Sequence, residues 1–124
     1  MPGPLVDIAR SNTILYCRAW DRTVRFYRDR LALPVVHANE WFVEFLVAEA
    51  SYLSIADSAR ATIDDVGGQG LTLSWRVADL DATRAHLLDR GLEPSEIHEV
   101  WNARACHLVD PEGHRIELWA GRSG

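Results

Sequence analysis

The chain repeats part of its sequence at an offset of 60 positions, and this internal repeat restricts the possible folds more than any other feature. The offset pairs Asp21 with Asp81, Thr23 with Thr83, Asp29-Arg30 with Asp89-Arg90, and Pro34 with Pro94. At 124 residues the chain is long enough for one ordinary domain and too short for two. The repeat therefore indicates two copies of one small supersecondary unit within a single domain.

Each half shows the same order of predicted elements. An alternating apolar and polar run comes first, at 12–18 and again at 71–77. A segment with apolar residues three and four apart follows and predicts a helix, at about 20–31 and about 80–90, with Gly91 ending the second. Three strand-like runs complete each half: 35–38, 41–47 and 51–56 in the first, then 93–98, 104–109 and 115–120 in the second. We therefore predict an α+β fold with two βαβββ modules, at about 10–57 and 70–121.

Two turn-like segments connect these elements. The stretch at about 58–69 joins the modules. Gly67-Gly68-Gln69-Gly70, where this stretch meets the second module, is interpreted as a flexible connector. It does not resemble a phosphate-binding loop, because no Lys-Ser/Thr pair follows the glycines. Asp110-Pro111-Glu112-Gly113 predicts a tight turn between the last two strands.

Composition excludes several classes of protein. The net charge is −5 and the basic residues form no cluster, which argues against nucleic acid as a partner. No run approaches the roughly 18 apolar residues of a membrane span, so we expect no membrane partner and a cytoplasmic location. Cys17 and Cys106 lie in separate apolar runs and are predicted to be buried free thiols.

The repeat and three motifs resemble the vicinal oxygen chelate superfamily. The motifs are F-Y-R-D-R-L-A-L at 26–33, V-A-D-L-D-A at 77–82 and D-P-E-G-H-R-I-E-L at 110–118. This superfamily includes glyoxalase I, extradiol dioxygenases, methylmalonyl-CoA epimerase, fosfomycin-resistance enzymes and bleomycin-resistance proteins. The resemblance implies a mixed sheet that curls around a cup, and it implies that short members act as homodimers with pockets at the subunit interface. A shared fold does not establish a shared activity.

Family enzymes hold a divalent metal with one residue from the first strand and one from the last strand of each half. The resemblance places these positions at Asn12, Ser54, Thr72 and Glu117. Three of the four side chains are neutral oxygen donors, which bind transition metals weakly. We therefore predict no metal and no other cofactor. A rescue by His107 beside Glu117 would still be two ligands short.

The same resemblance and period-two counting predict the residues that line the cup. The predicted ligand-binding residues are Asn12, Tyr16, Trp41, Ser54, Thr72, Arg76, Trp101, His107, Glu117 and Trp119. Ile14, Tyr52 and Ser74 share these faces, whereas either Glu44 or Val43 can point inward from its strand. Aromatic rings around an acid suit a flat organic ligand, including one that carries a positive charge.

Three interpretations of Glu117 remain open at this level. Its carboxylate contacts a ligand, forms a structural salt bridge with Arg76, Arg104 or Arg115, or, as the least favoured interpretation, binds a metal at a non-standard site. Three functions are considered for the whole chain. The first is a metal-independent small-molecule binding protein for drug sequestration or self-resistance. The second is a lyase, isomerase or dioxygenase-like enzyme with a non-standard or absent metal site, and the third is an interaction module whose own side chains fill the cup. No residue is assigned a catalytic role from the sequence.

Overall fold

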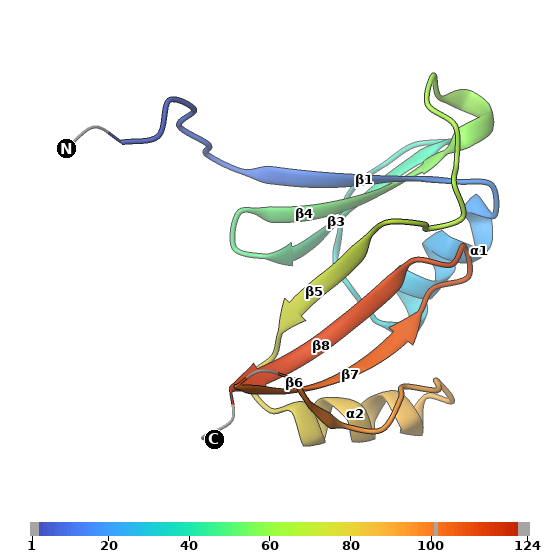
Figure 1. Cartoon of the computed structure of the whole chain (residues 1–124). Helices are drawn as coiled ribbons and strands as arrows, with labels where there is room; N and C mark the ends of the chain where they lie inside the picture. The colour runs from blue at the N-terminus through green and yellow to red at the C-terminus, as the bar shows by residue number, and fades with distance from the viewer. Residues whose placement is uncertain (1–2, 101, 122–124) are drawn as a thin grey trace. The chain divides into compact units, whose positions relative to one another are not determined.

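The computed structural model describes residues 3–100 and 102–121, which form two compact units (Figure 1). The first unit ends at Asp65 and contains β1 (Ser11–Cys17), α1 (Trp20–Arg25), β2 (Val35–Ala38), β3 (Phe42–Ala48) and β4 (Ser51–Asp57). The second begins at Val66 and contains β5 (Thr72–Arg76), α2 (Leu80–Asp89), β6 (His98–Val100), β7 (Ala103–Val109) and β8 (Arg115–Gly121).

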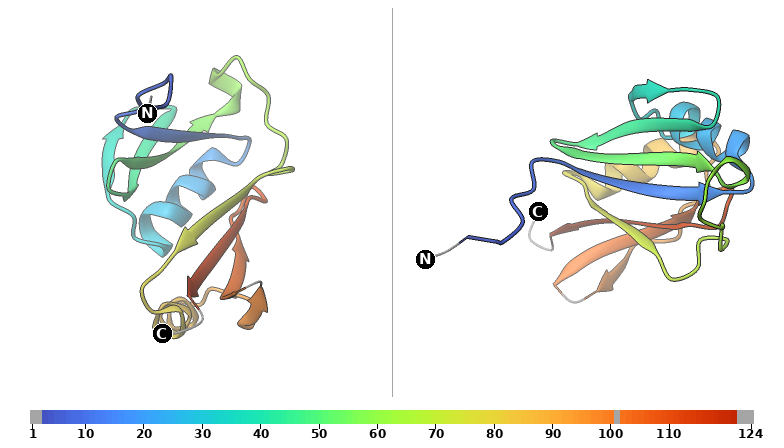
Figure 2. Two further views of the ribbon diagram at one scale, coloured as in Figure 1. Left: turned by 60° about the vertical axis from the view of Figure 1, so that its left-hand side comes forward. Right: turned by 90° about the horizontal axis from the view of Figure 1, so that it is seen from above.

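Both units have the same sheet topology, which confirms the predicted α+β class. The strand orders are β1-β4-β3-β2 and β5-β8-β7-β6. In each sheet the first strand runs parallel to the last, and the other neighbours are antiparallel (Figure 2). Ser54 pairs with Ile14 and Glu44 in the first sheet, as Glu117 pairs with Ser74 and His107 in the second. Ser54 and Glu117 therefore occupy equivalent positions in the repeat.

The core of the first unit lies between one face of its sheet and the helix. Leu15, Val43, Phe45, Leu53 and Ile55 are buried on that face. Tyr27 covers them, with its ring 6.1 Å from that of Phe45. Burial of each large apolar side chain contributes about 1.5–3 kcal/mol. The opposite face keeps the alternate residues of the same strands, and these carry the polar groups described below.

The first helix does not continue to residue 31 as one α-helix. After Arg25 it widens into a π-helical segment, Phe26–Arg30, in which Leu31 N–H donates to the Phe26 carbonyl at 3.0 Å. Phe26 and Tyr27, two adjacent aromatic residues at the start of this segment, are both buried. Ala32 then adopts a left-handed conformation with φ of 58°, although the sequence offers no glycine there.

The second helix begins at a cap that the sequence analysis did not single out. The Asp79 carboxylate accepts from Ala82 N–H at 3.0 Å, which satisfies one of the free donors of the first turn. Leu80 and Leu87 face the core, whereas Leu88 is exposed and does not. Gly91 follows the helix with φ of 77°, the conformation that glycine was predicted to supply.

The predicted strand at 93–98 is wrong, because β6 begins only at His98. Pro94 has no N–H to donate to a sheet ladder. Ser95 instead links the segment to β7: its hydroxyl accepts from His107 N–H at 2.9 Å and its own N–H donates to the His107 carbonyl at 2.8 Å. These two hydrogen bonds hold the backbone of His107, whose side chain belongs to the candidate site described below.

Two further predictions can be compared with the structure. Cys17 and Cys106 are buried free thiols, as expected, and burial raises the pKa of Cys106. Among residues 3–100 and 102–121, no helix has both the length and the hydropathy needed to cross a bilayer.

Candidate functional site

Glu117 is the centre of a polar cluster on β8 of the second unit. Ile116 and Leu118 are buried on the helix side of the sheet, so the Glu117 side chain projects from the opposite face. Ser74 Oγ on β5 donates to Glu117 Oε1 at 2.7 Å, and His107 Nε2 on β7 lies 3.5 Å from Oε2. The Glu117 side chain is 25% exposed, so it is partly desolvated yet still accessible.

The predicted pairing of His107 with Glu117 across the hairpin is present, and Arg115 also contacts the His107 ring. Arg115 Nη2 lies 2.6 Å from His107 Nε2, and the His98 ring stacks on the His107 ring at 5.0 Å between centroids. A guanidinium only donates, so this contact requires an unprotonated Nε2. Burial first, and then the positive charge of Arg115, lowers the pKa of His107, while the hydrogen bond with Glu117 opposes that shift.

We expect the pKa of His107 to lie below its ordinary value of 6.5 in the folded protein. The Arg115→Gln variant should raise this pKa, because it removes a neighbouring cation, and Glu117→Gln should lower it, because it removes the anion. NMR titration of the imidazole Hε1 resonance measures each value.

The same shift carries a pH dependence of stability. Below pH 6.5 the unfolded chain takes up a proton at this residue more readily than the folded chain does, so stability falls as the pH drops through 6.5. The His107→Gln variant should show a weaker loss over that range. A His107 pKa above 6.5 would contradict the described arrangement.

A second polar cluster lies on the corresponding face of the first unit. Glu44 on β3 projects away from the core while Val43 is buried, which answers the question left open by the sequence. Asn12 Nδ2 donates to Glu44 Oε2 at 3.0 Å, and Ser54 Oγ donates to Asn12 Oδ1 at 2.8 Å. Asn12 and Ser54 were predicted site residues, and the structure brings them together with Glu44.

Arg10 completes this cluster from the segment that precedes β1. Its Nη2 lies 2.9 Å from Glu44 Oε2, and its Cζ lies 3.6 Å from the centroid of the Tyr52 ring. Arg10 was not among the predicted site residues. Period-two counting back from Asn12 is the signal that would have placed it on the same face.

The other predicted site residues of the first unit lie at its edges. Tyr16 is half-buried on β1 and shares the Asn12 face. Trp41 directly precedes β3, where its ring lies 5.5 Å from that of Phe42 and its carbonyl accepts from Asp57 N–H at 2.8 Å. Trp41 is therefore held where β3 begins and β4 ends.

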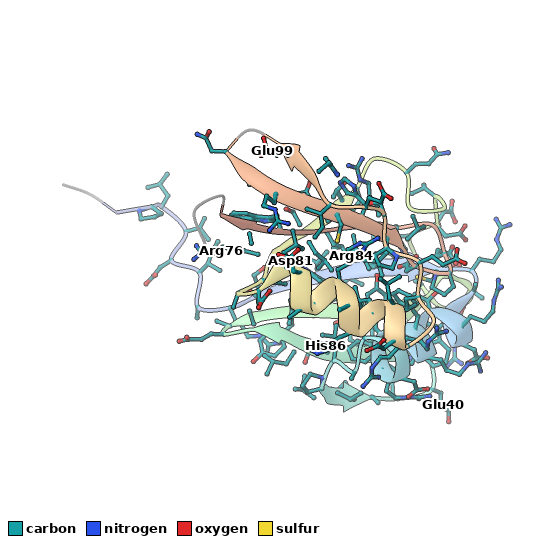
Figure 3. The ribbon with its side chains drawn as sticks, turned by 90° about the horizontal axis from the view of Figure 1, so that it is seen from below. Glu40, Arg76, Asp81, Arg84, His86 and Glu99 are labelled. Carbon is teal, nitrogen blue, oxygen red and sulfur yellow. The ribbon has the colours of Figure 1, made fainter. Side chains whose placement is uncertain are left out.

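In the second unit, Arg76 and Trp119 lie opposite each other on β5 and β8. They line a hollow of about 630 Å³ at the point where β5 leads into α2, together with Asp79, Asp81, Arg104 and Gly121. Figure 3 labels Arg76 at one side of this region and Asp81 on α2. Arg104 donates to Asp81 through both terminal guanidinium nitrogens, Nη1 and Nη2, at 2.9 and 3.0 Å. Thr72 is exposed at the start of β5, and Trp101 lies outside the described residues.

The side chains at the four expected ligand positions do not fit the divalent metal of the family. Asn12 and Ser54 are hydrogen-bonded to each other, so the amide oxygen of Asn12 is already engaged. Glu117 is the one carboxylate of the set, and its oxygens face Ser74 and His107. Within the described part of the chain, no three His, Cys, Asp or Glu side chains gather closely enough to bind a metal ion. A site of that kind needs about three imidazole or carboxylate ligands.

Comparison with known proteins adds the family. Residues 12–119 match the model of the glyoxalase-like domain. A glyoxalase/bleomycin resistance protein/dioxygenase from Nocardioides has a TM-score of 0.80 at 19% identity, over 98% of this chain and 88% of that one. The lactoylglutathione lyase from Agrobacterium tumefaciens has a TM-score of 0.74 at 19% identity, over 98% of this chain and 97% of that one.

An antibiotic binding protein from Streptomyces is also similar, with a TM-score of 0.77 at 18% identity, over 96% of this chain and 99% of that one. At these identities the structural likeness establishes the fold alone. No curated protein matches the chain. The family model spans residues 12–119, which include most of both βαβββ units, and the chain therefore belongs to the glyoxalase-like domain family.

Proposed function

We propose that this protein is a metal-independent small-molecule binding protein whose ligand contacts Glu117. The observation that carries this proposal is the environment of that carboxylate. Arg104 is paired with Asp81, and Arg115 contacts the His107 imidazole. Glu117 contacts the Ser74 hydroxyl and the His107 imidazole, whose pKa is lowered by burial first and then by Arg115. A partly desolvated anion of this kind suits a ligand that carries a positive charge or a hydrogen-bond donor.

The chemical class of the ligand follows from the side chains on the same face. Trp119 lies two residues after Glu117 on β8 and is half-buried, which leaves part of its ring available for stacking. We propose an aromatic organic ligand, bound by a homodimer without a metal or other cofactor in the cytoplasm. Neither nucleic acid nor a membrane is proposed as a partner. Drug sequestration or self-resistance fits such a protein, and the similar Streptomyces structure is named an antibiotic binding protein.

A second candidate is a lyase, isomerase or dioxygenase-like enzyme of the same family. The observation that favours it is His107, because an imidazole with a lowered pKa beside a carboxylate can accept a proton near neutral pH. The similar structure from Agrobacterium tumefaciens is named a lactoylglutathione lyase. Turnover that survives treatment with a chelator and is lost in His107→Gln would support the enzyme over the binding protein.

Titration with aromatic cationic drugs tests the leading proposal. We expect saturable quenching of tryptophan fluorescence by at least one member of a panel of glycopeptide and intercalating antibiotics, in protein dialysed against a chelator. Glu117→Gln should weaken that binding about 10- to 100-fold, because a hydrogen bond to a charged group contributes about 1.5–3 kcal/mol.

The matched control is Glu93→Gln, which removes an exposed carboxylate from the same unit and should leave the affinity unchanged. Absence of saturable quenching across the panel would contradict the proposal. Stoichiometric metal in the purified protein, with binding lost on its removal, would contradict its metal independence.

A further inference from the structure

The Arg10 guanidinium lies between an aromatic ring and a carboxylate in the first unit. Its Cζ is 3.6 Å from the Tyr52 ring centroid, and its Nη2 is 2.9 Å from Glu44 Oε2. A cation over a ring and a charge-assisted hydrogen bond to a carboxylate are the two interactions that recognise organic cations. Tyr52 and Glu44 therefore already hold one planar cation, supplied by this chain.

The sheet positions Tyr52 and Glu44 independently of Arg10. Glu44 lies on β3, its side chain is 16% exposed, and Asn12 Nδ2 holds its Oε2 from β1 at 3.0 Å. Asn12 is in turn held by the Ser54 hydroxyl, and Ser54 is fully buried. Tyr52 lies opposite Asn12 in the parallel β1–β4 pairing. The ring, the carboxylate and the amide thus come from three neighbouring strands of one rigid sheet.

Arg10, by contrast, is the loosely held partner. Its side chain is 50% exposed, and it precedes β1 in a segment that leads away from the sheet (Figure 1). Leu5, Val6 and Ile8 of that segment are exposed at 68% or more of their surface. An exposed ion pair of this type contributes little to stability. Movement of Arg10 would uncover the ring and the carboxylate without disturbing the core.

We propose that Tyr52 and Glu44 form a binding site for a small organic cation with a planar guanidinium or amidinium head, and that Arg10 competes for it as an intramolecular occupant. This inference goes beyond the proposed function, because it assigns a separate site in the first unit with its own ligand class. A guanidinium or amidinium can lie over the Tyr52 ring and donate to Glu44, as the Arg10 guanidinium does, whereas an ammonium has no planar face to stack on the ring. Such a ligand binds by displacing Arg10, so its apparent affinity is reduced by the fraction of molecules in which Arg10 occupies the site.

Benzamidine is the probe that tests the competition, with binding followed by changes in the backbone amide NMR signals of β3 and β4. We expect the Arg10→Gln variant to bind benzamidine about three- to tenfold more tightly than the wild-type chain, because the internal competitor is gone. Adding Glu44→Gln to Arg10→Gln should remove this gain. Adding Tyr52→Leu should also weaken binding, whereas Tyr52→Phe should retain it because the ring face remains.

The matched control is Arg28→Gln, which removes an arginine of the same unit that pairs with Asp29 at 2.8 Å. It should bind benzamidine like the wild-type chain. Arg10→Lys should restore part of the competition. Thermal unfolding of every variant verifies that each is folded, since all the substituted atoms lie outside the helix-facing core.

The inference is overturned if Arg10→Gln binds benzamidine no more tightly than wild type, or if Glu44→Gln leaves the gain intact. Its failure is distinguishable from failure of the proposed function. Antibiotic quenching that depends on Glu117 but not on Arg10 would overturn only this inference. Benzamidine binding that follows Arg10 and Glu44, without any antibiotic quenching, would support the cation site and contradict the drug-binding role.

Discussion

Replacement of Asp110 by alanine is expected to lower the free energy of unfolding by about 3–5 kcal/mol, because each buried donor left without its acceptor costs about 1–3 kcal/mol. Asp110 Oδ1 accepts from the backbone N–H groups of Glu112, Gly113 and His114 at 2.8–2.9 Å. Its Oδ2 lies 2.7 Å from His114 Nδ1, and both side chains are almost fully buried. Alanine would leave three backbone donors and an imidazole without this acceptor.

Asp110→Asn is the matched control for this prediction. Its amide oxygen can still accept from the three backbone donors, and only the contact with His114 changes. The decrease in the free energy of unfolding should therefore be clearly smaller than for alanine. Urea denaturation followed by tryptophan fluorescence measures both variants against the wild-type chain. An alanine variant within about 1 kcal/mol of wild type, the range of one ordinary hydrogen bond, would contradict the assigned role.

The position of this turn gives the result a functional consequence. Asp110 closes the turn between β7 and β8, and β8 carries Glu117 opposite His107. A loosened turn would therefore disturb the register of the two strands on which the candidate site depends. We expect Asp110→Ala to weaken ligand binding as well, although Asp110 is buried in the turn and lies outside the strands that carry Glu117 and His107.

The second large effect is expected at Gly68, where alanine should cost about 2–4 kcal/mol, from a left-handed backbone conformation and from overpacking. Gly68 has φ of +80°, and a Cβ built on it would lie 2.5 Å from the carbonyl carbon and oxygen of Gly113. That contact is with backbone, which cannot swing aside as a side chain would. The segment before β5 is thus packed directly against the turn before β8.

Gly70→Ala separates the two contributions to this effect. Gly70 also has a positive φ, +77°, but a Cβ there would meet nothing within 4 Å. Its substitution should therefore cost only the conformational part, about 1–2 kcal/mol. Equal losses for Gly68→Ala and Gly70→Ala in urea denaturation would show that the contact with Gly113 contributes nothing.

The glycines at 67–70 also show where interpretation of the sequence alone fell short. A run of glycines without a following Lys-Ser/Thr was interpreted as a flexible connector, and nothing in the run itself reveals that Gly68 lies against Gly113. The contact joins residues 45 positions apart. Its only sequence trace is that both positions lack a side chain, which many loop glycines share.

The mistaken strand at 93–98 has a different physical cause. The run follows the second helix as 35–38 follows the first, but Pro94 cannot join the ladder and Ser95 bonds β7 through its side chain as well as its backbone. Local propensity cannot reveal such a competing hydrogen bond, because the partner, His107, comes from elsewhere in the chain. The same limit applies to the π-helical segment at Phe26–Arg30, which local helix propensity did not predict.

Residue order alone determined the repeat, the α+β class and, for some of the strands, the side on which a residue lies. Period two in a strand and period 3.6 in a helix are local properties, and for that reason Glu117 and His107 could be placed on one face in advance. Only the tertiary structure decided which polar groups meet: Ser74 with Glu117, Arg115 with His107, and Arg10 with Glu44 and Tyr52. These pairs depend on strand register and on the path of the chain before β1, which are set by packing across the whole unit and not by neighbours in sequence.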